Sequence, residues 1–356
     1  MDGSPIAPML ARQVGAIPPG MAYEPKWDGW RCIIARDVAR TRLWSRRGSD
    51  LAGLFPEIVD ACAALPARCV LDGELVVLED GRLQYTRLAN RHASAARAAS
   101  LAAQFPASFV AFDVLGFEDV NLVDQPWHVR REVLDAMAEQ WQPPLLLSPV
   151  TRDREVAQRW FTAFEAAGLD GVVAKPLDQP YQPGVRAVFK VKHRRTADVV
   201  VAGFRLDRTH TPARPSLGSV LLGLYDEAGV LHHIGVAAAF PGDQRAELAR
   251  LFAELEVRPG EEGYDEHPWS EASARQTGAR VPDSVTRWSA PREEAHLIWP
   301  PLVCEVSYDA LHDRVRLRSN ASFVRWRPDR DPESCRFDQL ASPPGQSLTD
   351  ALGLDA

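Results

Sequence analysis

Lysine is rare in this sequence, and the few lysines present are candidates for chemistry. The 356 residues contain 41 lysines and arginines, and only Lys26, Lys175, Lys190 and Lys192 are lysines. A guanidinium stays protonated in proteins, whereas a lysine amine can lose its proton when it is desolvated, or serve as a compact point charge. Arginine therefore cannot replace lysine in either role. We expect at least three of the four lysines to share one site.

Lys26 has the surroundings of a nucleophile. It lies between Pro25 and Trp27, and Arg31 follows five residues later. The apolar run 32–35 predicts a buried strand directly after it. Desolvation and a cationic neighbour both lower the pKa of an amine, which makes it able to attack at neutral pH. The alternative is a surface turn ending in the Asp-Gly pair, because Lys-x-Asp-Gly alone is a weak signal.

Lys190 and Lys192 predict a binding site for an anion. They alternate with apolar residues in the segment 186–192, so on a strand both ammonium groups point to one face. Two adjacent cations repel each other unless an anion lies between them, and a polyphosphate is the natural candidate. The alternative is an edge strand whose lysines prevent aggregation.

Carboxylates lie within or beside the predicted apolar strands. Glu74 stands in the strand 70–78, Asp113 in the strand 109–115, and the strand 169–176 contains Asp170 and closes on Lys175. A carboxylate that is buried in such a strand needs a partner. The alternative for Glu74 is an outward position on an edge strand.

The composition limits the class of protein. The net charge of −7 argues against a chain coated in basic charge, but a local basic face could still bind nucleic acid. The five cysteines are odd in number and form no Cys-x-x-Cys pair, which argues against a disulfide framework or a structural zinc site. No leader sequence and no run of membrane-spanning length is evident. We expect a cytoplasmic protein with no membrane partner.

The order of predicted elements indicates an α+β chain of two domains. In residues 1–195, strands alternate with predicted helices at 53–65, 90–104, 128–141 and 153–168. From residue 196 come short strands, a helix at 242–255, a Pro-, Gly- and Glu-rich segment at 258–296 with no clear periodicity, and a last hairpin of 302–308 with 314–318. This order suggests a small barrel of the oligonucleotide-binding (OB) type over 196–340. Residues 341–356 are predicted to be a flexible tail.

The motifs together resemble those of the ATP-dependent DNA ligases of the small bacterial repair type, in the nucleotidyltransferase superfamily. They stand in that family's order, and the ordered set is far more specific than any one member. The set is Lys26-Trp27-Asp28-Gly29, Arg46 before Gly48, Asp72-Gly73-Glu74, Phe112-Asp113, Asp170 to Lys175, Lys190-Val191-Lys192 and Arg327-Pro328-Asp329-Arg330. The resemblance implies an ATP-grasp-like adenylation (nucleotidyltransferase) domain of antiparallel sheets and helices, followed by an OB-fold barrel.

The resemblance also implies a role for each residue. Lys26 would attack the α-phosphate of ATP and hold AMP as a phosphoramidate. The nucleotide contacts would be Glu24 beside the adenine, Phe112 stacked on it, Glu74 at the ribose hydroxyls, Arg31 and Arg46 at phosphate and sugar, and Arg186, Lys190 and Lys192 at the phosphates. Mg²⁺ or Mn²⁺ would be held by Asp28 and Asp170. Further site residues would be Lys175, Asp329 and Arg330.

Two positions depart from the family pattern. Asp170 stands where the family usually has glutamate, so its side chain is one carbon shorter. Arg330 replaces a lysine common in the last motif, which keeps the charge and changes its geometry.

The implied activity is the sealing of nicks in duplex DNA that carry a 5′-phosphate and a 3′-hydroxyl. The implied protein is a monomer associated with the nucleoid, with repair proteins acting as separate chains. The alternative enzymes are an RNA ligase or an mRNA-capping guanylyltransferase, which share Lys-x-Asp-Gly and a barrel domain. An NAD-dependent ligase is disfavoured because the sequence has no four-cysteine zinc module. The non-enzymatic alternative is a nucleic-acid-binding scaffold with an inactive nucleotide pocket.

Overall fold

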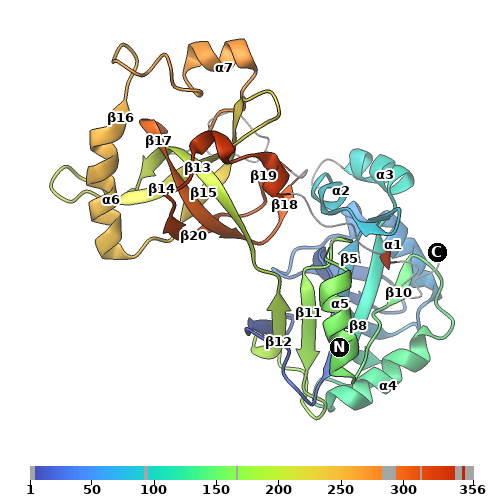
Figure 1. Ribbon diagram of the computed structural model, residues 1–356. Helices are drawn as coiled ribbons and strands as arrows, with labels where there is room; N and C mark the ends of the chain where they lie inside the picture. The colour runs from blue at the N-terminus through green and yellow to red at the C-terminus, as the bar shows by residue number, and fades with distance from the viewer. Residues whose placement is uncertain are drawn as a thin grey trace. The chain divides into compact units, whose positions relative to one another are not determined.

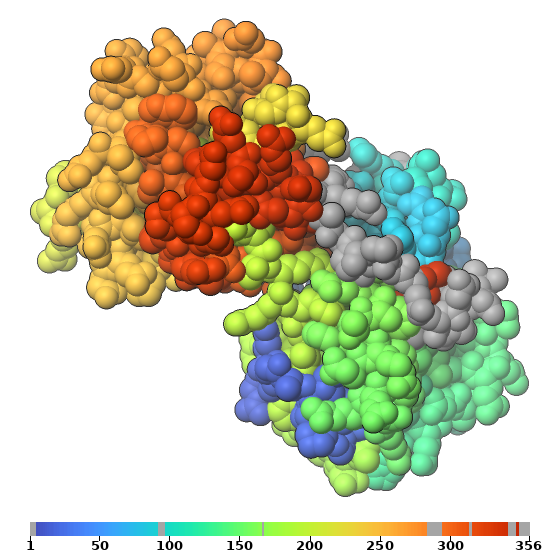
Figure 2. Space-filling view, in the orientation of Figure 1, coloured from blue at the N-terminus to red at the C-terminus, as the bar shows by residue number. Residues whose placement is uncertain are grey.

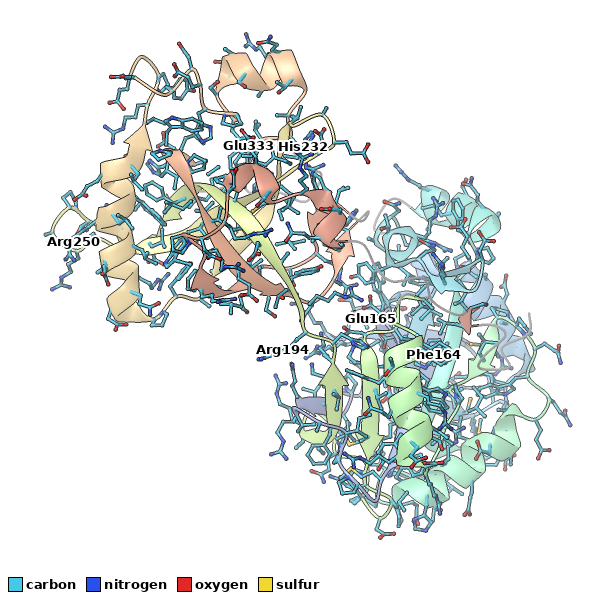
Figure 3. All side chains as sticks on the ribbon, viewed as in Figure 1. Phe164, Glu165, Arg194, His232, Arg250 and Glu333 are labelled. Carbon is cyan, nitrogen blue, oxygen red and sulfur yellow. The ribbon has the colours of Figure 1, made fainter. Side chains whose placement is uncertain are left out.

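The chain divides into two compact units (Figure 1). The computed structural model describes residues 5–91, 95–165, 167–282, 294–312, 315–340 and 347–348, without the side chains of 95 and 96. The first unit comprises Met1–His193 together with Ser342–Ala356, and the second comprises Arg194–Ala341. Arg194 is labelled in Figure 3 where the second unit begins. The sequence predicts this boundary near Arg195.

Two sheets form the frame of the first unit. The first has the strand order β1-β12-β11-β2, and its strands are Leu10–Gln13, Arg186–Lys192, Gly171–Lys175 and Ala22–Pro25 in that order. The second has the order β10-β8-β5-β3-β4, formed by Leu145–Leu147, Ser108–Phe117, Cys69–Val76, Trp30–Arg36 and Thr41–Ser45. β9 (Val120–Asn121) pairs with β8. β2 and β3 are consecutive in the chain but belong to different sheets, so the loop carrying Lys26 joins the two sheets.

Helices cover these sheets. α4 (Trp127–Ala138) packs against β8, and α5 (Arg154–Ala163) packs against β2 and β11 (Figure 1). α5 begins where the Asp153 side chain accepts a hydrogen bond from the backbone amide of Glu155, which satisfies an amide that has no partner within the helix.

Two predicted helices differ from the observed ones. The segment 53–65 is a 3-10 turn (Ala52–Leu54), then α1 (Pro56–Ala61), then a second 3-10 turn (Cys62–Ala64). Pro56 causes this division, because proline lacks an amide for the helix interior but is favoured in the first helical turn. The helix predicted at 90–104 is observed as α3 (Ala95–Gln104), and α2 (Tyr85–Ala89) precedes it.

The second unit is a closed barrel. Strands β13, β14, β15, β20 and β17 form a ring, because β13 pairs with both β14 and β17. Their bounds are Arg195–Leu206, Leu217–Tyr225, Leu231–Ala238, Ala321–Trp326 and His296–Tyr308. β15 pairs with β20 in parallel and the other pairs are antiparallel. A small barrel of this kind confirms the predicted OB fold. The predicted helix is α6 (Gly242–Leu255).

The end of the barrel differs from the prediction. In the part of 314–318 that the structure describes, no residue pairs with β17, which instead pairs with β13, with β20 and with β16 (Glu256–Val257). The shorter strands β18 (Leu311–His312) and β19 (Arg316–Leu317) pair with each other. The turn-forming residues between the two segments favoured a hairpin. In the closed barrel, β17 instead pairs with strands from other parts of the unit. Within 258–296 the structure adds α7 (Glu271–Thr277), and 283–293 lie outside the described residues.

The predicted flexible tail is wrong at Leu348. This side chain is fully buried, and its backbone amide donates a hydrogen bond to the carbonyl of Gly81 at 2.8 Å. Figure 2 shows red atoms of the C-terminal segment among the cyan and green atoms of the first unit. The rest of 341–356, apart from Ser347, lies outside the described residues.

Among the described residues, no helix has the length and apolar character needed to cross a bilayer.

Candidate active site

A cavity of about 220 Å³ in the first unit is lined by residues of both sheets. Its lining includes residues from β1, β2, β11 and β12 of the first sheet and from β3, β5 and β8 of the second. Nine of the fourteen predicted site residues line it: Glu24, Lys26, Arg31, Arg46, Glu74, Phe112, Lys175, Arg186 and Lys190. The fold therefore brings together residues from six separate stretches of sequence.

Lys26 and Lys192 share one carboxylate. The Lys26 Nζ atom lies 2.6 Å from Oδ2 of Asp170, and Lys192 Nζ lies 3.0 Å from the same oxygen. Burial acts to raise the pKa of Asp170, but the charges and hydrogen bonds of the two lysines outweigh it and hold that pKa below its ordinary value. Asp170 is therefore an anion that fixes two ammonium groups at the edge of the cavity.

Backbone hydrogen bonds hold Lys26 against Asp170. The Lys26 amide donates to the carbonyl of Gly171 at 2.9 Å, and the Asp170 amide donates to the carbonyl of Lys26 at 3.0 Å. Gly171 has φ +137°, and a Cβ at this position would lie 1.9 Å from the carbonyl oxygen of Val191. Only glycine fits there, because β11 and β12 approach too closely for a side chain. The same close approach brings Lys192 to Asp170.

Lys190 is a third cation on this side of the cavity. Burial and the charges of Lys192 and Lys26 lower its pKa below the ordinary value. β12 lies between β1 and β11, so it is an interior strand. The alternative of lysines guarding an edge strand therefore does not apply. Three cations around one carboxylate make a region suited to a polyphosphate.

Glu24 and Lys175 form a buried ion pair at the other end of β2 and β11. Lys175 Nζ lies 2.8 Å from Oε1 of Glu24 and donates a second hydrogen bond to the carbonyl of Phe112 at 2.9 Å. Burial raises the pKa of Glu24 above its ordinary value, and the charges of Lys175 and Arg131 only partly offset this. Lys175 also lies over the Phe112 ring, 4.8 Å from its centroid. The pair therefore fixes both Glu24 and the aromatic ring.

Arg31 is held on the opposite face of the cavity by Asp72. Its Nε and Nη2 atoms each lie 2.5 Å from an oxygen of Asp72, and its guanidinium lies 4.6 Å from the centroid of Phe112. Burial acts to lower the pKa of Arg31, but the Asp72 carboxylate outweighs it and holds that pKa above its ordinary value. The Tyr181 hydroxyl donates to the same carboxylate at 2.6 Å and accepts from the Met9 amide at 2.8 Å.

Glu74 is a carboxylate whose pKa is strongly raised by its surroundings. It stands on β5, a central strand, so the alternative of an edge position does not apply. Its Oε1 accepts a hydrogen bond from the Gly29 amide at 3.2 Å. Burial raises the pKa of Glu74 to about 7, despite the opposing charges of Arg31 and Lys26; the charge of Asp28 adds to the increase. Asp28 is thereby placed near Glu74, although it does not line the cavity.

Two arginines lie at the exposed rim. Arg46 follows β4 and Arg186 opens β12; both are exposed and both line the cavity. The Arg186 guanidinium donates to the carbonyl of Ala11 at 3.4 Å. Exposed arginines at a rim can bind an entering anion without first losing a buried partner.

Comparison with known proteins identifies the family. A family model for the ATP dependent DNA ligase domain matches residues 8–192, and one for the ATP dependent DNA ligase C terminal region matches residues 213–330. The chain is 46% identical over 349 residues to DNA ligase C2 of Mycolicibacterium smegmatis, a match that covers 96% of each chain. The chain belongs to the ATP-dependent DNA ligases. It is therefore an enzyme, and its membership of this family supports the sealing of nicks in DNA as its activity.

Further comparisons agree with this family. The ligase is 44% identical over 357 residues to DNA ligase C of Mycobacterium tuberculosis, covering 98% of this chain and 97% of the relative. A solved structure from a structure-function analysis of Lig E DNA ligases matches with a TM-score of 0.55 at 16% identity, covering 90% of this chain and 99% of that one. That likeness supports the fold. The alternatives of an RNA ligase and a capping enzyme are not favoured by these matches.

The ligase carries Asp329 and Arg330 on its second unit, where both belong to a charged cluster. Arg327 donates two hydrogen bonds to Asp198, at 2.8 and 3.0 Å, and pairs with Asp329 at 2.8 Å. Arg330 Nε lies 3.4 Å from the same Asp198. Asp198 on β13 thus orients both arginines of the last motif.

Sequence reasoning gave no role to two residues of the ligase cavity, Asp72 and Tyr181. Asp72 stands two positions before Glu74 on β5, so the strand period of two predicts that both point to one face. Tyr181 could not have been found, because it lies in a turn-rich segment far in sequence from Asp72. The pairing of Lys175 with Glu24 was likewise missed, since it depends on which strands are neighbours.

Proposed function

We propose that Lys26 is the nucleophile by which this ligase captures AMP from ATP. The observation that carries the proposal is the convergence of Lys26, Lys190 and Lys192 around Asp170 at one side of the cavity. Such an arrangement supplies an amine together with cations for the phosphates. The Glu24, Lys175 and Phe112 group supports the adenine end of the same cavity.

The proposed reaction has three displacements. The Lys26 amine forms a bond to the α-phosphorus of ATP, and the bond to the β-phosphate breaks, releasing pyrophosphate. The 5′-phosphate of the nick then attacks the same phosphorus, breaking the bond to Lys26 and forming an adenylylated DNA end. Finally the 3′-hydroxyl attacks the 5′-phosphorus and releases AMP. Storing AMP on an amine divides a difficult reaction into easier steps.

Lys26 must lose one proton before it attacks, because an ammonium group has no lone pair, and a second proton as the phosphoramidate forms. Asp170 Oδ2 is the acceptor within hydrogen-bond distance. Because the two lysines hold the pKa of Asp170 low, it is a weak base; we propose that it accepts the first proton to free the amine, and that water or the departing pyrophosphate takes the second. Lys192 then keeps a cation beside the phosphate throughout. Arg31, oriented by Asp72, would contact the nucleotide from the opposite face.

A divalent cation is part of the proposal. Among the described residues, no group of three or more metal-binding side chains is found. Mg²⁺ often takes only one or two protein carboxylates and completes its shell with phosphate oxygens and water, so the site fits this requirement. We propose Asp28 as a ligand. Asp170 could serve as the second only by releasing Lys26 or Lys192. The cation would neutralise negative charge on the phosphates.

The substrate we propose is nicked duplex DNA, bound by a monomer, with any repair proteins acting as separate chains. The test measures the rate at which the enzyme seals a labelled nick that carries a 5′-phosphate and a 3′-hydroxyl. Each assay contains either ATP or GTP, together with either Mg²⁺ or Mn²⁺. A parallel substrate carries the nick in an RNA strand. We expect sealing of the DNA nick with ATP. Preference for GTP or for the RNA strand would contradict the proposal.

A further inference from the structure

Leu348, near the end of the chain, is part of the core of the first unit. Its side chain is fully buried, and it belongs to a cluster with Trp27, Leu169 and Phe164. Phe164, labelled in Figure 3, follows directly after α5. The hydrogen bond from the Leu348 amide to Gly81 fixes the backbone at the same place.

The cluster includes the chain neighbours of the proposed catalytic pair, Lys26 and Asp170. Trp27 follows Lys26 in the chain, and Leu169 precedes Asp170. Both are buried, at 5% and 2% exposure, and Phe112 packs against the same cluster. The residues next to Lys26 and next to Asp170 in the chain therefore belong to one hydrophobic cluster, of which Leu348 is also a member.

The chain path makes this contact unusual. The chain leaves the first unit at His193, forms the barrel over Arg194–Ala341, and rejoins the first unit from Ser342. The barrel is thus inserted in the sequence of the first unit and is connected to it at both ends. A segment that follows the barrel supplies a core residue behind Lys26.

We propose that Leu348 is a positioning residue for adenylylation, acting through Trp27 and Leu169. Removing a buried side chain leaves a cavity that the surroundings fill only in part, so both neighbours gain freedom to move. The distance between Lys26 and its partner then varies, and displacements of about 1 Å in a reacting group can slow a reaction by about a hundredfold. Leu348 does not line the cavity, so the affinity for ATP should change little. This inference rests on the role proposed for Lys26.

The test compares three variants of the full chain. Leu348→Ala creates the cavity, and Leu348→Met keeps the volume of the side chain. Leu134→Ala removes an equally buried leucine of α4 that belongs to a different cluster. Two rates are measured for each variant: capture of AMP at saturating ATP, and sealing of a nick that already carries AMP. Hydrogen exchange followed by mass spectrometry reports on the segments 24–31 and 167–173.

The expected result is selective. Leu348→Ala should capture AMP about tenfold more slowly and exchange faster at both segments, while keeping most of its sealing of the adenylylated nick. Leu348→Met should restore both readouts. Leu134→Ala, if it loses activity through unfolding, should lower both rates in proportion and raise exchange across the whole first unit rather than selectively at 24–31 and 167–173.

Two results would overturn the inference. One is an AMP-capture rate in Leu348→Ala equal to that of the wild type. The other is a fall of both rates in the same ratio as in Leu134→Ala, which would make Leu348 merely a stabilising residue. Absence of an AMP adduct in the wild type would instead overturn the proposed function. The hydrogen-exchange comparison tests the contact independently of that outcome.

Discussion

At the scale of single residues, the cavity is organised by carboxylates that hold cations. Asp170 holds Lys26 and Lys192, Asp72 holds Arg31, and Glu24 holds Lys175. A flexible cationic side chain loses conformational freedom when it binds a ligand, and a carboxylate partner imposes much of that loss in advance. The cavity is therefore prepared for a nucleotide before the nucleotide enters.

Glu74 gives the protein a pH-dependent stability. In the unfolded chain this group titrates near 4.5, whereas burial raises its pKa to about 7 in the folded protein. The folded state therefore binds the proton more tightly, and the contribution is fully present below pH 4.5 and lost as the pH rises through about 7. Without ATP and divalent cations, wild type should lose about 3 kcal/mol across this range relative to Glu74→Gln. Urea unfolding at several pH values measures the difference, and parallel curves for the two proteins would contradict it.

The Glu24–Lys175 pair predicts a large penalty for removing one partner. Lys175→Met keeps the side-chain volume and leaves Glu24 buried without its closest cation. We expect a loss of about 3–5 kcal/mol in the free energy of unfolding at pH 8. The double variant Glu24→Gln with Lys175→Met removes the uncompensated charge and should recover most of it. A double variant no more stable than Lys175→Met would show that the charge is not the cause.

The sequence indicated which residues belong to the site, but not which of them pair with each other. The scarcity of lysine pointed to all four lysines, and the structure places them around one cavity. Which carboxylate meets which lysine depends on strand order, for which a single sequence holds little information. Asp170 was predicted as a metal ligand, yet here it contacts two ammonium groups.

At the scale of elements, the close approach of β11 and β12 determines the position of Lys192. Gly171→Ala would place a Cβ 1.9 Å from the Val191 carbonyl oxygen at a φ of +137°. We expect a loss of about 3 kcal/mol in unfolding free energy and slower AMP capture, because the strands must separate. At Gly53, a Cβ would meet nothing within 4 Å, so Gly53→Ala should stay within about 0.5 kcal/mol of wild type. Equal stability of the two variants, measured by urea unfolding, would refute the steric argument.

Local periodicity predicted most strands and helices near their observed positions, because these elements have an apolar pattern of their own. It failed where a distant partner decides. β17 was paired with the wrong segment, and the strand β20 was not predicted, because barrel closure selects its partners across the unit. Leu348 was assigned to a tail because the other members of its cluster are far away in sequence.

At the scale of the whole molecule, the ligase consists of a unit that holds the cavity and a barrel that carries the last motif. Asp329 and Arg330 belong to the barrel, where Asp198 orients Arg330. We propose that Arg330 assists the departure of pyrophosphate. This assistance is needed only while ATP is cleaved.

This role predicts that removing the Arg330 side chain affects the capture of AMP and the sealing of the nick differently. Arg330→Ala should slow AMP capture about tenfold or more and leave sealing of an adenylylated nick nearly intact. Lys192→Ala should impair both, because its charge stays beside Asp170 throughout. Single-turnover assays of the two steps measure this difference. If Arg330→Ala seals the adenylylated nick as poorly as it captures AMP, Arg330 is instead a DNA contact or a structural partner of Asp198.

The central claim is that Lys26 carries AMP, and mass spectrometry of peptides tests it most directly. Wild-type protein incubated with ATP and Mg²⁺, then digested, should yield AMP on one peptide only, the peptide containing Lys26. Lys26→Arg should yield no adduct, because a guanidinium remains protonated and cannot attack phosphorus. An adduct on Lys175, Lys190 or Lys192 in the wild type, or one that persists in Lys26→Arg, would contradict the account.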